Sequence, residues 1–106
     1  MSDKKGEVRL AAEGKNARLV FPSELRVGGA KGLVALLARV LRKKPGAVIL
    51  DAGALERLDT AGLQAIVVMW SAFSEAGVPA RWERCSAGVA GTAKLAGLAS
   101  AAGMDL

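Results

Sequence analysis

Histidine and tyrosine are missing from this 106-residue sequence, and cysteine occurs once, as Cys85. A histidine general base, a Ser-His-Asp or Cys-His nucleophile and a zinc site of the His/Cys type therefore cannot be built within one chain. A disulfide within the chain is excluded as well, and a lone cysteine is typical of a reducing compartment, so we expect a cytoplasmic protein. These absences predict a chain that is not an enzyme and carries no cofactor.

Long hydrophobic runs are missing too. The longest uncharged stretch covers residues 60–74, which is shorter than the roughly 18–20 apolar residues that a membrane span needs. The first six residues are polar and do not resemble a signal peptide. Hydrophobic residues nevertheless make up 52% of the chain. We therefore expect no membrane insertion, a disordered tail over residues 1–6 and one packed domain over residues 7–106.

The charge is unevenly distributed along the chain. Residues 1–44 hold eleven basic and four acidic residues (+7), and residues 45–106 hold four basic and six acidic residues (−2), which gives the net +5. Arg39, Arg42, Lys43 and Lys44 cluster where a helix is expected to end. Such a cluster could grip phosphates, but it also complements a helix dipole, and no aromatic residue lies among its members. We expect a solvated helix end and no nucleic-acid partner.

Hydrophobic periodicity predicts two strands and then a helix in the first half. Glu7–Ala12 and Ala17–Phe21 alternate around a polar turn, which indicates a hairpin. The glycine-rich segment Gly28–Gly32 lacks the spacing of a phosphate-binding loop and is predicted to be a flexible connector. From about Ala30 to Lys44 the apolar positions have helical spacing. That apolar stripe consists of Leu33, Leu36, Leu37, Val40 and Leu41.

The second half alternates strands with helices. Ala47–Asp51 is a short apolar run that predicts a strand buried on both faces, with helices above and below it. A helix is expected from the Asp59-Thr60 pair to Ala76, with Gly77 ending it. Ala80–Cys85 alternates charged and apolar residues, as edge strands do, and Ser86 is placed to cap a third helix, from Ala87 to Leu98. The sequence therefore predicts an α/β domain: a small mixed sheet of about four strands, with helices packed on it.

The segment of greatest functional interest leads from the strand end at Asp51 to the second helix. Thr60 is a natural N-cap, whose hydroxyl would accept a hydrogen bond from the N–H of Gly62 or Leu63. Most threonines in this position serve only as helix caps, which is the purely structural interpretation of Thr60. A phosphate on the same hydroxyl would be tolerated beside the positive end of the helix dipole, and the glycine would let a partner approach closely. Asp51, Glu56 and Asp59 could in principle hold magnesium, but no nucleophile or base accompanies them.

At these residues the sequence resembles the STAS family, the domain of sulfate transporters and anti-sigma factor antagonists. The resemblance runs from about Val8 to Leu98. It is carried by four segments: Val48–Asp51, Asp59-Thr60-Ala61-Gly62-Leu63, Ala76-Gly77-Val78 and Leu95-Ala96-Gly97-Leu98. The family pattern is Asp-Ser/Thr-x-Gly, in which a partner kinase phosphorylates the hydroxyl residue of the anti-sigma factor antagonists.

The resemblance implies a role for each matching residue. Thr60 takes the phosphoacceptor position, and Asp51 matches the acidic residue that closes the preceding strand. The implied partner-binding residues are Asp51, Asp59, Thr60, Ala61, Gly62 and Leu63. The expected function is that of a bacterial signal-transduction module that binds an anti-sigma factor or a serine-kinase-like regulator and is switched by phosphorylation at Thr60.

Two departures from the family pattern leave alternatives open. Thr60 replaces the commoner serine, and Ala61 replaces a frequent second hydroxyl residue. The motif is also similar to that of the STAS subunit of a phospholipid-trafficking ABC transporter, whose threonine contacts the ATPase subunit and need not be phosphorylated. Short STAS proteins that accompany chemotaxis kinases are similar as well.

Overall fold

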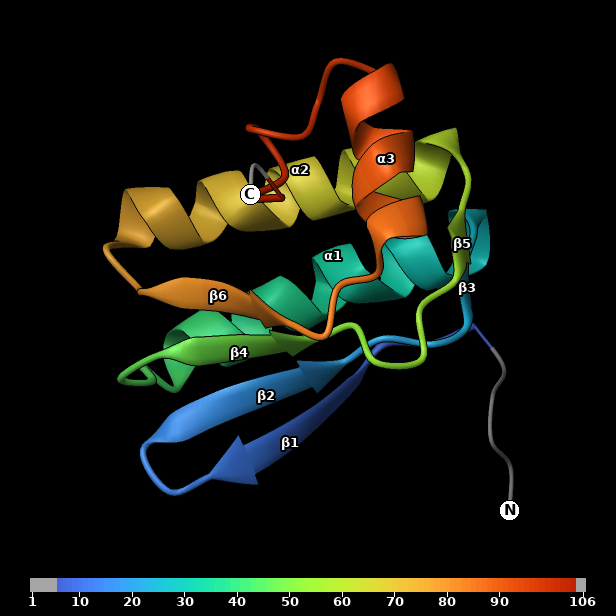
Figure 1. Cartoon of the computed structure of the whole chain (residues 1–106). Coiled ribbons are helices and arrows are strands. Elements are labelled where there is room, and N and C mark those ends of the chain that lie inside the picture. Colours follow the sequence, from blue (N-terminus) through green and yellow to red (C-terminus); the bar gives the residue numbers. More distant parts are fainter. Residues whose placement is uncertain (1–5, 105–106) are drawn as a thin grey trace.

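A computed structural model describes residues 6–104, so the expected tail over residues 1–6 lies outside the described residues except for Gly6. Helices and short strands alternate along the described part of the chain (Figure 1). The strands are β1 (Arg9–Glu13), β2 (Asn16–Val20), β3 (Glu24–Leu25), β4 (Val48–Asp51), β5 (Arg57–Leu58) and β6 (Ala80–Glu83), and the helices are α1 (Val27–Arg42), α2 (Thr60–Ala76) and α3 (Ala87–Leu95).

The main sheet is mixed and has the strand order β1-β2-β4-β6. β1 and β2 form the predicted antiparallel hairpin, whereas β2, β4 and β6 run parallel. Leu19, Leu50 and Trp82 lie side by side across the three parallel strands. The predicted α/β class is confirmed, and β6 occupies the edge that its charge alternation indicated.

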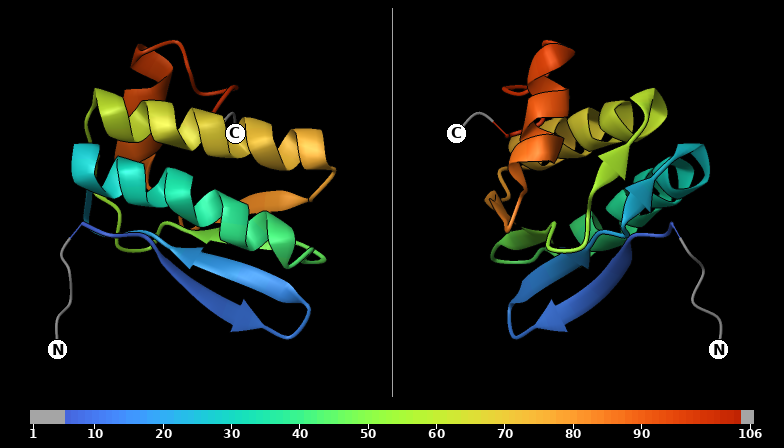
Figure 2. Two further views of the ribbon diagram at one scale, coloured as in Figure 1. Left: turned by 180° about the vertical axis from the view of Figure 1, so that it is seen from behind. Right: turned by 45° about the vertical axis from the view of Figure 1, so that its right-hand side comes forward.

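Helices α1 and α2 lie against each other and cover the same face of the sheet (Figures 1 and 2). The prediction of helices on both faces of Val48–Asp51 is therefore wrong. Ile49 points to the outer face and is only 3% exposed, with Arg18 and Arg81 as its cross-strand neighbours. Since long arginine side chains can cover apolar surface with their methylene groups, a fully buried strand does not require a second layer of helices.

Helix α1 begins at Val27, three residues before the predicted start, so Gly28 and Gly29 belong to its first turn rather than to a connector. The predicted stripe is otherwise confirmed, with Leu33, Leu37 and Val40 buried. A Cβ at Gly29 would overlap the backbone oxygen of Gly6. This glycine therefore permits close packing of the chain rather than flexibility.

A two-residue parallel ladder between β3 and β5 was not predicted. It pairs Glu24 with Arg57 and Leu25 with Leu58. Each of these strands leads into a helix, β3 into α1 and β5 into α2. The ladder therefore brings the N-terminal ends of the two helices side by side, as Figure 2 shows. This arrangement positions the segment that carries Thr60.

The C-terminal part of the chain packs against α2 and β6, where Gly103 adjoins Trp70 and the Ala102 carbonyl oxygen accepts from Trp82. Ser86 caps α3 as predicted, and its hydroxyl accepts from the Val89 N–H, but the helix ends at Leu95 rather than Leu98. The chain then turns back, and Ala102 and Met104 are buried in the core. These two residues close the core at the end of the described chain.

Candidate functional site

Helix α2 is capped by Asp59 and not, as predicted, by Thr60. The Asp59 Oδ1 atom accepts from the Gly62 N–H at 2.8 Å, and the Asp59 carbonyl oxygen accepts from the Leu63 N–H at 2.9 Å. Both residue types can cap a helix, but a carboxylate also interacts favourably with the positive end of the helix dipole. The cap is thus one residue earlier than the sequence pattern indicated.

This shift changes the position of Thr60, which becomes the first residue of α2 and is exposed. Its hydroxyl has no hydrogen-bond partner among residues 6–104. The exposed hydroxyl is therefore accessible to solvent. The chemistry expected of Thr60 therefore does not compete with the integrity of the helix.

Gly62 and Leu63 are buried rather than presented to a partner. A Cβ at Gly62 would overlap the carbonyl oxygen of Leu25 and lie 3.2 Å from its Cγ. The expectation that this glycine makes room for a partner is wrong, because β3 of the same chain occupies that space. Leu63 is only 4% exposed. The part of the motif open to a partner consists of Asp59, Thr60 and the half-buried Ala61.

An apolar groove lies between α1 and α2 beside this motif. Its volume is about 390 Å³, and it includes Ala61, the residue after Thr60. Val27, Val34 and Val68 line it and are 57%, 47% and 50% exposed. Sequence reasoning did not single out these valines as functional. The signal was their position, because Val27 and Val34 lie outside the buried stripe of α1, where an exposed helix surface usually carries polar residues.

Asp51 lies at the end of β4 and does not line the groove. Its carboxylate accepts from the Gly53 N–H at 3.0 Å, from Arg84 at 2.6 Å and from Arg18 at 3.0 Å. The Gly53 N–H and the two guanidinium groups hold the pKa of Asp51 below its ordinary value, against the opposing effect of burial. The partner contact that the resemblance implies for Asp51 stays a prediction. The hydrogen bonds of Asp51 in the structure are with Arg18, Gly53 and Arg84 of the same chain.

Arg18 extends this ion-pair network across the outer face of the sheet. It pairs with Glu13 and, at 3.1 Å, with Glu83. Hydrogen bonding to Arg18 lowers the pKa of Glu83. Arg84 adopts a left-handed backbone (φ 59°) from which its side chain reaches Asp51 rather than the neighbouring thiol. Burial raises the pKa of the Cys85 thiol.

The described part of the chain contains neither a cluster of metal-ligating side chains nor a membrane-spanning helix. Between residues 6 and 104 no group of three or more Asp, Glu or Cys side chains is arranged to hold a metal ion, and the Asp51, Glu56 and Asp59 set is no exception. No helix within the same residues is long and apolar enough to cross a bilayer.

Comparison with known proteins adds information on the fold alone. No protein-family model and no curated protein sequence matches the chain. Among solved structures, the crystal structure of Mglu is similar, with a TM-score of 0.69 and 24% sequence identity. The match covers 82% of this chain but only 22% of Mglu. The likeness supports the α/β architecture, and it extends over a small part of a much longer protein.

Proposed function

We propose that this chain is a non-enzymatic protein-interaction module of the STAS type, which binds a partner protein through Thr60 and the adjoining groove between α1 and α2. The observation that carries the proposal is an exposed hydroxyl at a helix N-terminus, followed by Ala61, which lines a groove together with half-exposed valines. Apolar side chains exposed together in this way are typical of protein-binding surfaces. The partner class is an anti-sigma factor or a serine-kinase-like regulator.

Phosphorylation of Thr60 supplies the switch. A phosphothreonine carries a charge of about −1.5 to −2 at pH 7, and the helix N-terminus offers it a favourable dipole. The same dianion would stand beside an apolar groove and the Asp59 carboxylate, so a partner seated there would have to desolvate it. Phosphorylation is therefore expected to leave α2 folded and to weaken partner binding.

A second candidate function is that of an accessory subunit of an ABC ATPase. The groove favours it, since permanent interfaces are more hydrophobic than transient ones. This alternative predicts that Thr60 is unmodified in cells, that the chain co-purifies with an ATPase and that ATPase activity falls when the chain is removed.

Intact-mass spectrometry of the protein from its own cells, before and after phosphatase treatment, separates the two functions. The switch predicts a phosphate that disappears in Thr60→Ala and persists in Thr92→Ala, a change at an exposed threonine on α3. Affinity for the purified partner should fall at least ten-fold in Thr60→Asp and remain close to wild type in Thr92→Asp.

A substitution in the groove tests the surface itself. Val68→Lys introduces a charge at a half-exposed position, so it should weaken binding at least ten-fold while the unfolding midpoint changes little. Unchanged affinity in Thr60→Asp, Thr60→Ala and Val68→Lys together would show that the partner binds elsewhere or that no such interaction exists.

A further inference from the structure

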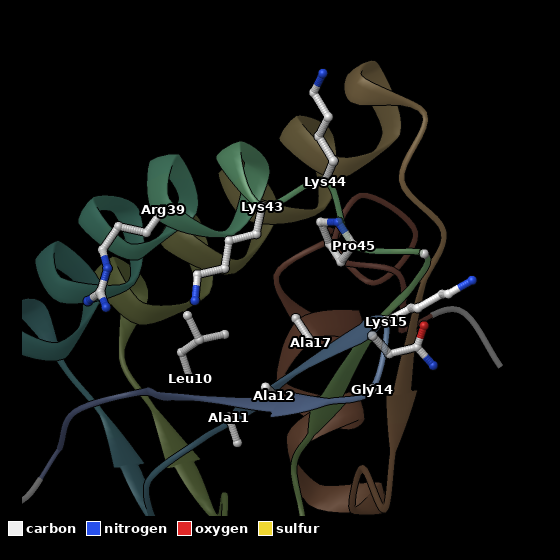
Figure 3. A pocket seen from close by; sticks show the side chains of 12 residues that line it. Leu10, Ala11, Ala12, Gly14, Lys15, Ala17, Arg39, Lys43, Lys44 and Pro45 are labelled. Carbon is white, nitrogen blue, oxygen red and sulfur yellow. The ribbon is translucent and has the colours of Figure 1, made fainter.

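A second hollow lies at the other end of α1, between its last turn and the β1–β2 hairpin (Figure 3). Its volume is about 520 Å³. Residues of the hairpin, of the helix end and of the turn that follows it line the cavity. Neither Thr60 nor any residue of α2 takes part, so this cavity is independent of the proposed partner surface.

Two cationic side chains reach into this hollow from α1. Arg39 and Lys43 are four residues apart, which places them on the same side of the helix end, and both line the hollow. Figure 3 shows Lys43 extending toward Leu10, with Arg39 beside it on the preceding turn. Lys15 and Lys44 point away from it in the same view. Two positive charges therefore border the same hollow.

Neither cation has an anionic partner in the described part of the chain. Residues 6–104 contain no carboxylate within 4.0 Å of Arg39 or Lys43, whereas Arg18 and Arg84 both pair with Asp51. Placing two like charges side by side without a counterion costs free energy, which an anion bound between them would recover. An Arg and a Lys together offer several N–H donors for carboxylate or phosphate oxygens.

The rest of the cavity wall combines aliphatic residues with the polar residues Lys15, Asn16 and Lys44. Leu10, Ala12, Ala17 and Pro45 line it, and an adjoining hollow between β1 and α1 extends the apolar surface to Val8 and Leu36. Neither hollow contains an aromatic residue on which a nucleotide base could stack. The lining fits a ligand with a negatively charged head and an aliphatic body.

The helix dipole opposes an anion at this place, but it is the weaker effect. A helix C-terminus is equivalent to about half a negative charge. Two of its last carbonyl groups, those of Val40 and Leu41, already accept hydrogen bonds from the backbone N–H groups of Lys43 and Lys44. The two full positive charges on Arg39 and Lys43 outweigh the remaining partial charge.

We propose that this cavity binds a single-chain aliphatic anion, with Arg39 and Lys43 holding a carboxylate or phosphate head and the surface from Leu10 to Leu36 covering the hydrocarbon chain. The head could belong to a free alkyl phosphate or fatty acid, or to a lipid in a membrane. The chemistry of recognition is the same in either case.

Titration of the whole ¹⁵N-labelled chain with octyl phosphate tests this site. Amide shifts are expected to move in residues 10–17 and 39–46. Shortening the ligand from octyl to butyl phosphate should weaken binding, by up to roughly four-fold for each methylene lost. Octanol, which has the same tail without a charge, should bind at least ten-fold more weakly.

Matched variants separate the site from general charge attraction. Lys43→Ala and Arg42→Ala each remove one positive charge from the end of α1, but only Lys43 lines the cavity. Lys43→Ala should weaken octyl phosphate binding at least five-fold, and Arg42→Ala less than two-fold. Equal effects of the two variants, or equally tight binding of inorganic phosphate and octyl phosphate, would overturn the proposal.

Vesicles of anionic phospholipid distinguish the two sources of the head group. Binding of octyl phosphate without vesicle binding supports a free ligand, and binding of both, weakened by Lys43→Ala, supports capture of a membrane lipid. Vesicle binding without octyl phosphate binding would contradict the proposed ligand site and would indicate electrostatic attraction to the membrane surface instead. Thr60 lies at the start of α2, beside the opposite end of α1 from this cavity. Thr60→Asp should therefore leave all of these binding results unchanged, whether or not the proposed switch is correct.

Discussion

Asp51 is a buried carboxylate whose hydrogen bonds are all made within the fold. Its oxygens accept from one backbone N–H and two arginines, and the residue is 8% exposed. Asp51→Ala leaves Arg18 and the Gly53 N–H without this acceptor, so we expect the free energy of unfolding to fall by about 1–2 kcal/mol in urea titrations.

The depressed pKa of Asp51 also gives this contribution a pH dependence. A carboxylate whose pKa is lower in the folded state stabilises the fold above its unfolded value of about 3.9, and the benefit is lost as the pH falls through the folded pKa. Wild-type stability should therefore decline below about pH 4, and more steeply than that of Asp51→Asn. Parallel curves for the two proteins would show that Asp51 is not responsible. Glu24→Gln, which removes an exposed partner of Arg26, serves as the control.

At the scale of elements, the contact between β3 and α2 depends on Gly62. Gly62→Ala adds a methyl group that overlaps the Leu25 carbonyl oxygen, and backbone on both sides cannot yield easily. Alanine is better than glycine in a helix by about 1 kcal/mol, but overpacking costs about 1–3 kcal/mol. We expect a net loss of stability and a displaced β3–β5 ladder.

Gly32 provides the matched comparison for that substitution. It also lies inside a helix, and a Cβ there would meet nothing within 4 Å. Gly32→Ala should therefore raise the free energy of unfolding by about 0.5–1 kcal/mol. Chemical denaturation of the two variants should give changes in the free energy of unfolding of opposite sign, if close packing rather than helix propensity explains the glycine at position 62.

At the scale of the whole molecule, the chain after α3 closes the core over both tryptophans. Trp82 donates its indole N–H to the Ala102 carbonyl oxygen at 2.9 Å and packs against Phe21, and Gly103 adjoins the ring of Trp70. Trp82 is therefore half-buried, and the C-terminal segment and Phe21 hold it in place.

Removing the Met104 side chain tests this closure, because the residue is 3% exposed. Met104→Ala should lower the free energy of unfolding by about 2 kcal/mol and shift tryptophan emission to longer wavelength as water reaches the indole rings. Ser100→Ala changes an exposed residue of the same segment and should leave both measurements as in wild type. Identical emission spectra for the three proteins would show that the segment does not shield the tryptophans.

Local sequence signals determined most of the element order. The helical spacing from Leu33 to Val40, the β1–β2 alternation and the Gly77 and Ser86 boundaries were all readable because each depends on residues within a few positions of one another. The β3–β5 ladder was not readable, because two-residue strands have no periodicity and their partners lie more than 30 residues apart.

The sequence by itself therefore determined the α/β class, the order of the long elements and the placement of Thr60 at the start of the second helix. Only the tertiary structure decided which residue caps α2, what fills the space at Gly62 and that one sheet face is covered by charged side chains. It alone also placed Arg39, Lys43 and Leu10 around one hollow. The physical reason is common to all of these features: each depends on distant segments brought into contact, and a periodic pattern reports which side of an element is apolar but not what will lie against it.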